Sequence, residues 1–352
     1  MKKLIIKNVS MNSSDYLHMA DWWSPLDDET KHVKCTLCPH QCIIGPDRYG
    51  RCKVRKNSAG ILYSVSYGRP VALHVDPVEK KPLYHFYPGE SVFSIGTMGC
   101  NLSCDFCQNW TISQAGYDKI PSSETYSPED IVQLTRDAGL RLIAFTYNEP
   151  TVYAEYMKNI AEIAVEKGMK TISVTNGFVT ADFIPDLYEN VHAFNIDLKA
   201  FSDSFYRKYT GASFFEILET IKTIHVLKKH LEITTLIIPG LNDSQEELRH
   251  EFEWILYNTG ELTPLHLSAF YSAYKRQYHA PTSPETLVKA RELALDIGLK
   301  YVYIGNVSGV DNSTYCPDCH ARIINRHSYQ IQVEQVRVCT CGRLIDIVTP
   351  DK

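Results

Sequence analysis

The sequence predicts a parallel α/β fold, and a barrel or partial barrel suits it better than an open doubly wound sheet. Two observations support this prediction. Short apolar or β-branched runs alternate with helix-like segments between residues 92 and 304, which is the pattern of repeated βα units. Polar residues follow several successive runs, and in a barrel such positions meet at the face that carries the active site. The alternation alone leaves both kinds of sheet open.

The expected strands have the lengths of buried parallel strands. They are Val92–Ile95, Leu142–Thr146, Thr171–Thr175, Ala193–Leu198, Leu231–Ile238, Leu265–Phe270 and Tyr301–Ile304. Helices are expected after Ser283-Pro284 and after Asp243-Ser244, because a serine before an apolar 3–4 repeat is a helix-start signal. Three helix-like segments between the strands end at a glycine, at Gly168, Gly260 and Gly298.

Composition places the chain among ordinary globular proteins. Of its 352 residues, 44 % are hydrophobic and 22 % are charged, and the formal net charge is −5. The negative charge argues against a dedicated nucleic-acid binder, which usually carries a basic patch. No run is apolar for long enough to cross a bilayer, and the start of the chain does not resemble a signal peptide. We therefore expect a cytoplasmic protein without a membrane partner.

The eleven cysteines fall into three tight groups, which are more typical of metal sites in a reducing compartment than of disulfides. The central group is Cys100, Cys104 and Cys107, with the spacing C-x3-C-x2-C directly after the first strand. Three thiolates on one loop can hold three irons of a 4Fe–4S cluster and leave the fourth iron open for a ligand. A zinc site that lacks one ligand, or a chance cluster, is the alternative.

Polar residues at the expected strand ends form the second candidate set. They are Asn148, Glu149, Thr175, Asn176, Asp197, Lys199 and His266. Asp197 and Lys199 point to the same face of their strand because side chains alternate along it. Each residue also has a structural interpretation, since Asp–Lys pairs are usually ion pairs and a histidine in a strand is usually a core residue. Their occurrence in order after the cysteine loop favours a shared binding site.

Two further groups of four cysteines flank the barrel segment. The N-terminal quartet is Cys35, Cys38, Cys42 and Cys52, and its soft ligands suit zinc or an auxiliary iron–sulfur cluster, with unligated thiols as the alternative. The C-terminal quartet is Cys316, Cys319, Cys339 and Cys341, whose paired spacing predicts a zinc ribbon. Neither quartet is needed to complete the central group.

With these motifs in view, the chain resembles radical S-adenosylmethionine (SAM) enzymes of the pyruvate formate-lyase activating enzyme type, and more closely the AmmeMemoRadiSam system radical SAM enzymes. The resemblance rests on the N-terminal motif from Cys35 to Arg55, the cysteine loop with Phe106 before its third cysteine, Asp197-Leu198-Lys199 and the segment 301–306. It implies a partial (βα)6 TIM-like barrel at 91–310. An N-terminal four-cysteine module at 1–90 and a C-terminal zinc-ribbon-like module at 311–352 complete the expected division.

The resemblance also implies roles for single residues. The thiolates of the central loop would bind the cluster, and the backbone of Phe106 to Gln108 would lie against the adenine of SAM. The strand end at Asn148 and Glu149 would receive the amino group of SAM, although Tyr147 and Asn148 stand where the family often has two glycines. Further cofactor contacts would come from Thr175, Asn176, Asp197, Lys199 and His266.

The implied activity is reductive cleavage of SAM into methionine and a 5′-deoxyadenosyl radical, which takes a hydrogen atom from a substrate that the sequence does not identify. A protein glycine is one candidate. Flavodoxin or ferredoxin would supply the electron, and AmmeMemo-type proteins are expected partners. Two alternatives are a non-catalytic zinc-ribbon adaptor and a simple iron–sulfur electron carrier.

Overall fold

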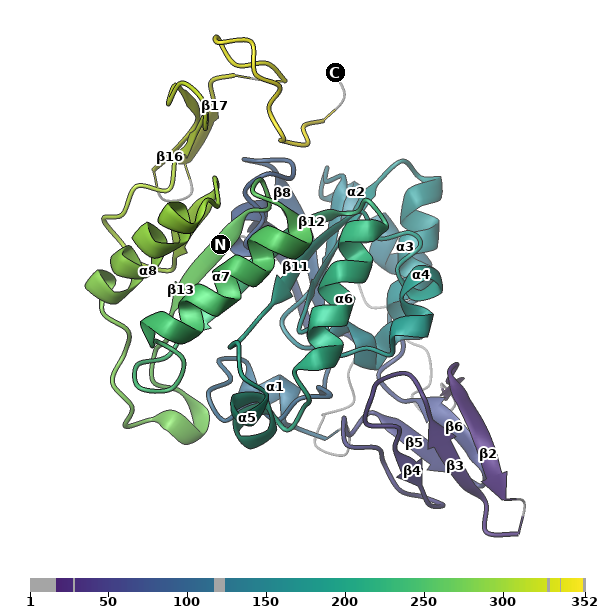
Figure 1. The fold of residues 1–352 in the computed structure, drawn as a ribbon. Coiled ribbons are helices and arrows are strands. Elements are labelled where there is room, and N and C mark those ends of the chain that lie inside the picture. The colour runs from purple at the N-terminus through teal and green to yellow at the C-terminus, as the bar shows by residue number, and fades with distance from the viewer. Residues whose placement is uncertain (1–16, 28, 117–123, 328–329, 336, 351–352) are drawn as a thin grey trace.

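In the computed structural model, residues 17–27, 29–116, 124–327, 330–335 and 337–350 are described. An eight-stranded sheet forms the centre, and its strands follow one another in sequence order from β7 to β14 (Figure 1). They are β7 Ala72–Pro77, β8 Ser91–Gly96, β9 Leu142–Phe145, β10 Lys170–Thr175, β11 Ala193–Asp197, β12 His230–Ile237, β13 Leu265–Ala269 and β14 Val302–Gly305. All seven strands expected from the sequence are confirmed.

The order of the strands determines the shape of the sheet. Neighbours from β8 to β14 pair in parallel, and only β7 pairs antiparallel with β8. Parallel crossovers are right-handed, so a sheet that adds each new strand on the same side places all its helices on one face and curls. The order therefore gives a partial barrel rather than a doubly wound sheet, and the predicted fold class is confirmed.

The connecting helices cover the outer face of the sheet (Figure 1). The longer ones are α2 Pro128–Asp137, α3 Ala154–Glu166, α6 Phe215–Val226, α7 Gln245–Thr259 and α8 Pro284–Ile297. Shorter turns are η1 Val78–Lys80, α1 Trp110–Ser113, η3 Pro150–Tyr153, η4 Ala181–Phe183, α4 Ile184–Leu187, α5 Asp203–Phe205, η5 Tyr206–Thr210 and η6 Tyr274–Arg276. Ser244 and Ser283 accept hydrogen bonds from backbone N–H groups in the first turns of α7 and α8, so both predicted helix starts are confirmed.

Two small sheets form the N-terminal module at the lower right of Figure 1. One contains β1 His18–Met19, β5 Arg55–Ser58 and β6 Ile61–Ser64, and the other contains β2 Trp23–Asp27, β3 His32–Cys35 and β4 Ile43–Ile44. Apolar residues of this module, such as Val33 and Leu37, belong to the same hydrophobic core as the barrel. The module is therefore packed into the barrel and not merely tethered to it.

The predicted boundary at residue 90 falls within the β7–β8 hairpin. β7 pairs along its whole length with β8, from Ala72 opposite Gly96 to Pro77 opposite Ser91. This strand was not expected from the sequence, because it is half-exposed, carries a proline and lacks the apolar pattern of the other strands. Pairing at the sheet edge, where proline is tolerated, explains the position of Pro77.

The C-terminal module lies at the opposite end of the barrel (Figure 1). Its sheet contains β15 Thr314–Tyr315, β16 Arg322–His327 and β17 Gln330–Val333, and it has a small core of its own around Ile323 and Ile324. Backbone hydrogen bonds join Val348 to the barrel segment at His85 and Tyr87. Among the described residues, no helix combines the length and the apolar character that a membrane span requires.

Candidate active site

A cavity of about 360 Å³ opens at the carboxyl ends of the barrel strands. The three cysteines of the central loop line one side, and polar residues from β9 to β13 and the turns that follow them line the rest. This is the end of a parallel barrel at which functional groups from many strands converge. The residues predicted to bind a cofactor that line it are Phe106, Gln108, Asn148, Glu149, Thr175, Asn176, Asp197 and Lys199.

The central loop follows β8 through Gly99, a position that requires glycine. Gly99 has φ +82°, and a Cβ atom there would lie 2.4 Å from the carbonyl oxygen of Cys52. Asn148 holds the same stretch: its side chain accepts a hydrogen bond from Thr97 N at 2.9 Å and donates to Gly99 O at 2.8 Å. Asn148 thus acts on the loop that carries the cysteines, in addition to lining the cavity.

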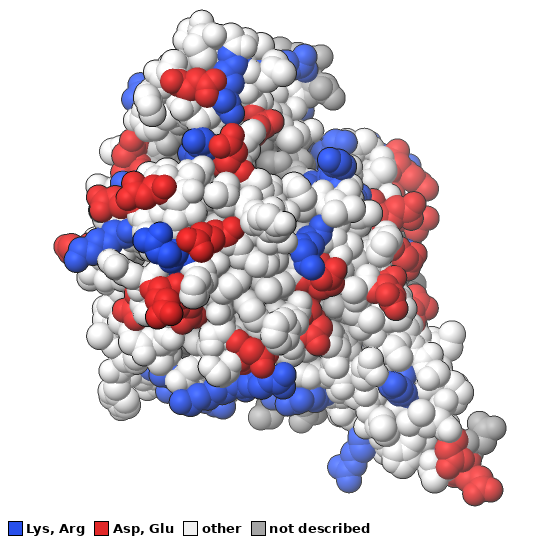
Figure 2. Space-filling view, in the orientation of Figure 1, with Lys and Arg blue, Asp and Glu red and all other residues white. Residues whose placement is uncertain are grey.

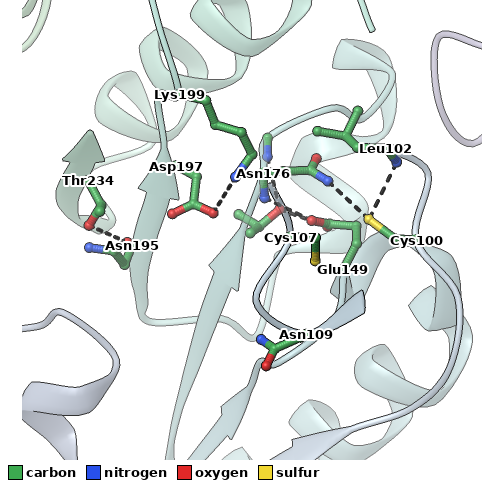
Figure 3. Close-up of polar contacts among 12 residues, drawn as sticks. Cys100, Leu102, Cys107, Asn109, Glu149, Asn176, Asn195, Asp197, Lys199 and Thr234 are labelled. Carbon is green, nitrogen blue, oxygen red and sulfur yellow. Dashed lines mark hydrogen bonds and ion pairs between the residues drawn. The ribbon is translucent and has the colours of Figure 1, made fainter. Parts of the chain in front are cut away.

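All three cysteines line the cavity, and Figure 3 shows the sulfurs of Cys100 and Cys107 beside Glu149 and Asn176. Leu102 N donates to Cys100 Sγ at 3.4 Å, and Cys107 Sγ lies 3.2 Å from Ser113 Oγ. Burial raises the pKa of the Cys104 thiol to about 12, and burial followed by the charge of Glu149 raises the pKa of Cys100 well above its usual value. Buried thiols of this kind become thiolates when a cation binds them, so the set fits iron.

Glu149 lies at the end of β9 and is almost completely buried. Its Oε1 accepts hydrogen bonds from Thr151 N, Thr151 Oγ1 and Thr175 Oγ1 at 2.7–3.0 Å, and its Oε2 accepts one from Asn176 N at 2.8 Å. Burial raises its pKa, whereas these bonds lower it. Oε2 keeps acceptor capacity toward the cavity, where a cationic amine would find it.

Asn176 connects the third strand end to the cysteine loop. Its Nδ2 donates to Asn101 Oδ1 at 2.9 Å and contacts Cys100 Sγ at 3.7 Å (Figure 3). Because the same strand end supplies Thr175 to Glu149, these contacts bind the loop, β9 and β10 into one hydrogen-bonded wall.

Asp197 and Lys199 form the ion pair that their spacing predicts, with 2.8 Å between Lys199 Nζ and Asp197 Oδ2 (Figure 3). Burial lowers the pKa of Lys199, but the nearby charges of Asp197 and Cys104 more than reverse this effect and raise it. The ammonium group therefore stays charged beside Cys104, where it stabilises a thiolate or an anionic ligand group.

Phe106 and Gln108 border the cavity from the far end of the loop. Phe106 is buried and packs 5.9 Å from the ring of Phe205, while Gln108 donates from Nε2 to Tyr271 O at 2.8 Å. The backbone between them is thus fixed from both ends.

His266 does not line the cavity, and in this respect the prediction from sequence was wrong. It is the second residue of β13, one side-chain layer below Ser268, which does line the cavity. Its Nε2 lies 2.6 Å from Glu232 Oε2 in the buried lower layer of the barrel. A strand that carries a polar residue early in its run directs it to the amino end of the barrel, away from the carboxyl face.

The sequence does not indicate a partly buried cluster of three side chains, two of which, Lys81 and Tyr147, line the cavity. Lys81 donates to Asp76 Oδ2 at 2.7 Å, Tyr147 OH donates to the same oxygen at 2.6 Å, and Lys81 lies 4.6 Å from the ring centre of Tyr147. Although burial opposes ionisation, these bonds lower the pKa of Asp76 to about 2. The family resemblance marks Tyr147 only as a departure from two glycines, and nothing in the sequence links it to residue 81.

The floor of the cavity comes from β11 and β12. Thr234 Oγ1 donates to Asn195 Oδ1 at 2.9 Å, and Asn195 Nδ2 donates to Pro82 O at 2.8 Å (Figure 3). Asn195 has the same strand parity as Asp197, so alternation could have identified it. No sequence pattern identifies Pro82 as a cavity residue. It reaches the cavity because the segment after β7 crosses the amino end of the barrel.

Basic residues gather at the rim near the carboxyl ends. Figure 2 shows a band of Lys and Arg along the lower edge of the molecule. Arg207 and Lys208 belong to η5 and Lys275 and Arg276 to η6, two segments whose backbone bonds to the central loop at residues 103 and 105. The rest of the face carries both signs of charge interspersed, in keeping with the modest net charge.

The sulfurs of the C-terminal quartet are compactly arranged. All four lie within 4.8 Å of one another, with 3.7 Å between Cys316 and Cys341 and 3.5 Å between Cys319 and Cys339. Four sulfurs bound tetrahedrally to zinc at about 2.3 Å would be about 3.8 Å apart, so this set fits a single zinc ion. The N–H of Cys341 lowers the pKa of Cys339 to about 6, which favours the thiolate that zinc requires.

Comparison with known proteins agrees with this geometry. Residues 94–252 match the family model described as "Radical SAM superfamily". An uncharacterized protein of Methanocaldococcus jannaschii (MJ0808) is 43 % identical over 335 residues, covering 94 % of this chain and 99 % of that protein. A GTP 3′,8-cyclase of Desulforamulus reducens is 27 % identical over 175 residues, covering 48 % of this chain and 50 % of the cyclase.

A crystal structure of a radical SAM methyltransferase from Sphaerobacter thermophilus aligns with a TM-score of 0.49 and 16 % identity, over 64 % of this chain and 70 % of that one. The family match covers the cysteine loop and the strand ends from β9 to β12 that share its cavity. The Methanocaldococcus jannaschii relative extends the likeness to 94 % of the chain. We conclude that the chain belongs to the radical SAM superfamily.

Proposed function

We propose that this protein is a radical SAM enzyme that abstracts a hydrogen atom from a substrate still to be identified, with a protein glycine as one candidate. The observation that carries the proposal is the meeting, in one cavity, of three cysteine sulfurs with an acidic strand end and a row of polar strand ends. When bound, the cluster and SAM supply reductive cleavage to methionine and a 5′-deoxyadenosyl radical.

Different residues of the cavity would hold the cluster and bind SAM. Cys100, Cys104 and Cys107 would hold the cluster, and Asn148 keeps their loop in place from below. Glu149 would accept the amino group of SAM at Oε2, the oxygen with a single protein partner. Charge-assisted hydrogen bonds of this type are strong in a buried site, so Glu149 orients the cofactor as well as binding it.

Lys199 would bind an anionic group of the cofactor next to the cluster, while Asp197 sets the direction of its ammonium group. The backbone from Phe106 to Gln108 would lie against the adenine. Thr175 and Asn176 act mainly through Glu149 and Cys100, which they orient by hydrogen bonds. Burial of these groups excludes water from the reacting centre, as radical chemistry requires.

The partners follow from the same proposal. Flavodoxin or ferredoxin is the proposed one-electron donor, and AmmeMemo-type proteins are proposed partners in the cytoplasm. The C-terminal quartet would hold zinc. The two alternative functions are a zinc-ribbon adaptor and an iron–sulfur electron carrier. The adaptor would bind no iron cluster, and the electron carrier would not cleave SAM.

Anaerobic reconstitution with iron and sulfide, followed by reduction in the presence of SAM, tests the proposal. We expect 5′-deoxyadenosine and methionine from the intact protein and at least a 100-fold smaller yield from Cys104→Ala. Cys319→Ser, which alters the distant C-terminal quartet, is the matched control and should cleave SAM at a normal rate. Zinc binding without an iron cluster would indicate the adaptor, and a cluster without cleavage would indicate the electron carrier.

A further inference from the structure

The N-terminal quartet lines a small, partly open cavity beside the shared core. Cys35 ends β3, Cys38 and Cys42 lie in the turn before β4, and Cys52 precedes β5. Together with Arg55 and Asn101 they line a cavity of about 20 Å³. The four thiols therefore share one cavity.

The spread of these sulfurs differs from that of the C-terminal quartet. Among the described residues, only the C-terminal quartet brings three or more ligand atoms within 4.8 Å of one another. The N-terminal quartet and the central loop both lie outside that limit. One zinc ion needs sulfurs about 3.8 Å apart, whereas the thiolates of an iron–sulfur cluster bind different irons and stand farther apart. The N-terminal quartet therefore has the spread of a cluster site.

A buried donor without a partner belongs to a residue that lines the same cavity. The Arg55 side chain is 2 % exposed and forms a buried ion pair with Glu155 through one of its terminal nitrogens. Its Nε has no hydrogen-bond partner among the described residues. Buried donors are rarely left unsatisfied. A sulfide or thiolate in the cavity that Arg55 lines would accept this bond and balance the charge.

The quartet also adjoins the central loop. His40 Nε2 lies 2.8 Å from Asn101 O, and Asn101, which borders the N-terminal cavity, reaches with Oδ1 to 4.0 Å from Cys100 Sγ. Cys52 O lies against the backbone of Gly99, the residue before Cys100. One residue therefore separates the two sites, and both lie in one continuous core.

We propose that Cys35, Cys38, Cys42 and Cys52 hold a second iron–sulfur cluster, which passes electrons to the cluster of the central loop across Asn101. In each transfer, a low-potential one-electron donor protein reduces the N-terminal cluster by one electron. That cluster is then reoxidised as it reduces the central cluster by one electron. The occupancy of the site stands independently, whereas its role as a relay rests on the proposed function.

Iron and sulfide analysis tests the occupancy. The Cys100→Ala/Cys104→Ala/Cys107→Ala variant, reconstituted anaerobically, should retain about four irons per chain and a visible cluster absorption. Adding Cys38→Ser and Cys42→Ser should remove that iron, whereas adding Cys319→Ser and Cys341→Ser should leave it. If the triple variant does not fold, iron analysis of the intact protein gives the answer. About eight irons per chain would indicate two clusters, and about four would indicate the central cluster alone. Zinc or no metal at the N-terminal quartet overturns the proposal.

Reduction kinetics test the relay. In the protein with an intact central loop, Cys38→Ser/Cys42→Ser should slow the reduction of the central cluster by reduced flavodoxin at least tenfold. Freeze-quench EPR measures the rate of this reduction. Reduction by dithionite, a small reductant that can enter the cavity, should change less than twofold. Equal rates with flavodoxin in both proteins would remove the relay. If both clusters form and reduce normally but SAM is not cleaved, the proposed function fails and the second cluster stands.

Discussion

The N-terminal quartet shares the hydrophobic core of the barrel, whereas the C-terminal quartet belongs to a small core of its own. The first lies beside the carboxyl ends of the strands and the second at the amino ends (Figure 1). Four cysteines in each region are equally good soft ligands. Their surroundings differ: the N-terminal set is supported by packing around a cavity, and the C-terminal set closes on itself.

This difference teaches that a metal in each region would have a different task. A module with a few buried side chains cannot stabilise itself by burial alone and depends on its metal. A module that is part of a large core does not need a metal to fold, so its cysteines are available for chemistry. Four changes would break or sharpen the contrast, in order of decreasing effect.

Loss of the zinc ion proposed for the C-terminal quartet should have the largest effect. Zinc in small domains is bound with about 10–16 kcal/mol, most of it linked to folding. In Cys316→Ser/Cys339→Ser we expect residues 314–327 and 330–333 to lose protection from hydrogen exchange, together with the segment at His85 and Tyr87 that pairs with Val348. Cluster absorption of the central loop should persist. Unchanged exchange would show that packing, not metal, holds this module.

Arg55→Met tests whether the N-terminal module is anchored in the barrel. Removal of one partner from the buried Arg55–Glu155 pair leaves a charge unpaired and should cost about 3–5 kcal/mol of unfolding free energy, measured in urea. The control is Lys158→Met, which breaks the exposed pair with Asp186 and should cost at most about 1 kcal/mol. Equal costs for the two variants would contradict the shared core.

Arg326→Met should loosen the C-terminal module by a smaller amount. The buried guanidinium donates to Tyr84 O and Thr314 Oγ1 at 2.5 Å and stacks 4.5 Å from the ring centre of Tyr84. Loss of hydrogen bonds from a charged group costs about 1.5–3 kcal/mol. Exposed Arg322→Met on the same strand is the control. Hydrogen exchange at residue 84 should rise only in Arg326→Met. A rise in both variants would show that the buried contacts of Arg326 are not its cause.

Glu251 gives a pH test confined to the barrel, where both quartets stay untouched. Burial raises its pKa to about 8, while Thr235 Oγ1 donates to its carboxyl group. The unfolded state loses this proton near pH 4.5 and the folded state near pH 8, so between these values stability falls as pH rises. The slope is at most about 1.4 kcal/mol per pH unit.

Glu251→Gln removes that proton and should flatten the fall in stability between pH 6 and pH 7, as followed by urea unfolding at each pH. Zinc and iron contents should match those of the unchanged protein. A variant as pH-dependent as the original would assign the dependence to another group.

Much of the barrel was predictable because buried parallel strands are written as local apolar runs. The strands from Val92 to Ile304 were found from such runs, and the helix starts at Ser244 and Ser283 from their capping pattern. β7 escaped because an edge strand is half-exposed and has no such run. Its pairing with β8 depends on residues outside the strand itself.

The sequence predicted the site residues that lie at strand ends. It did not predict the side-chain layer of the barrel in which a strand residue lies, or which residues come from a segment that crosses the barrel. Glu149, Asn176 and Asp197 reach one cavity because parallel strands end at one face. His266 has the right chemistry but the wrong layer, and it pairs with Glu232 instead. Lys81 and Pro82 enter the cavity from a segment that crosses the barrel, which no local pattern indicates.

The sequence by itself determined the ligand types, their grouping into three sets, and the polar residues at successive strand ends, because spacing and periodicity are local properties. Only the tertiary structure decided which sulfurs approach one another closely, because that distance depends on the core in which each set lies. The same number of cysteines can enclose one ion or surround a cavity, and packing of distant residues such as Arg55 and Asn101 makes the difference.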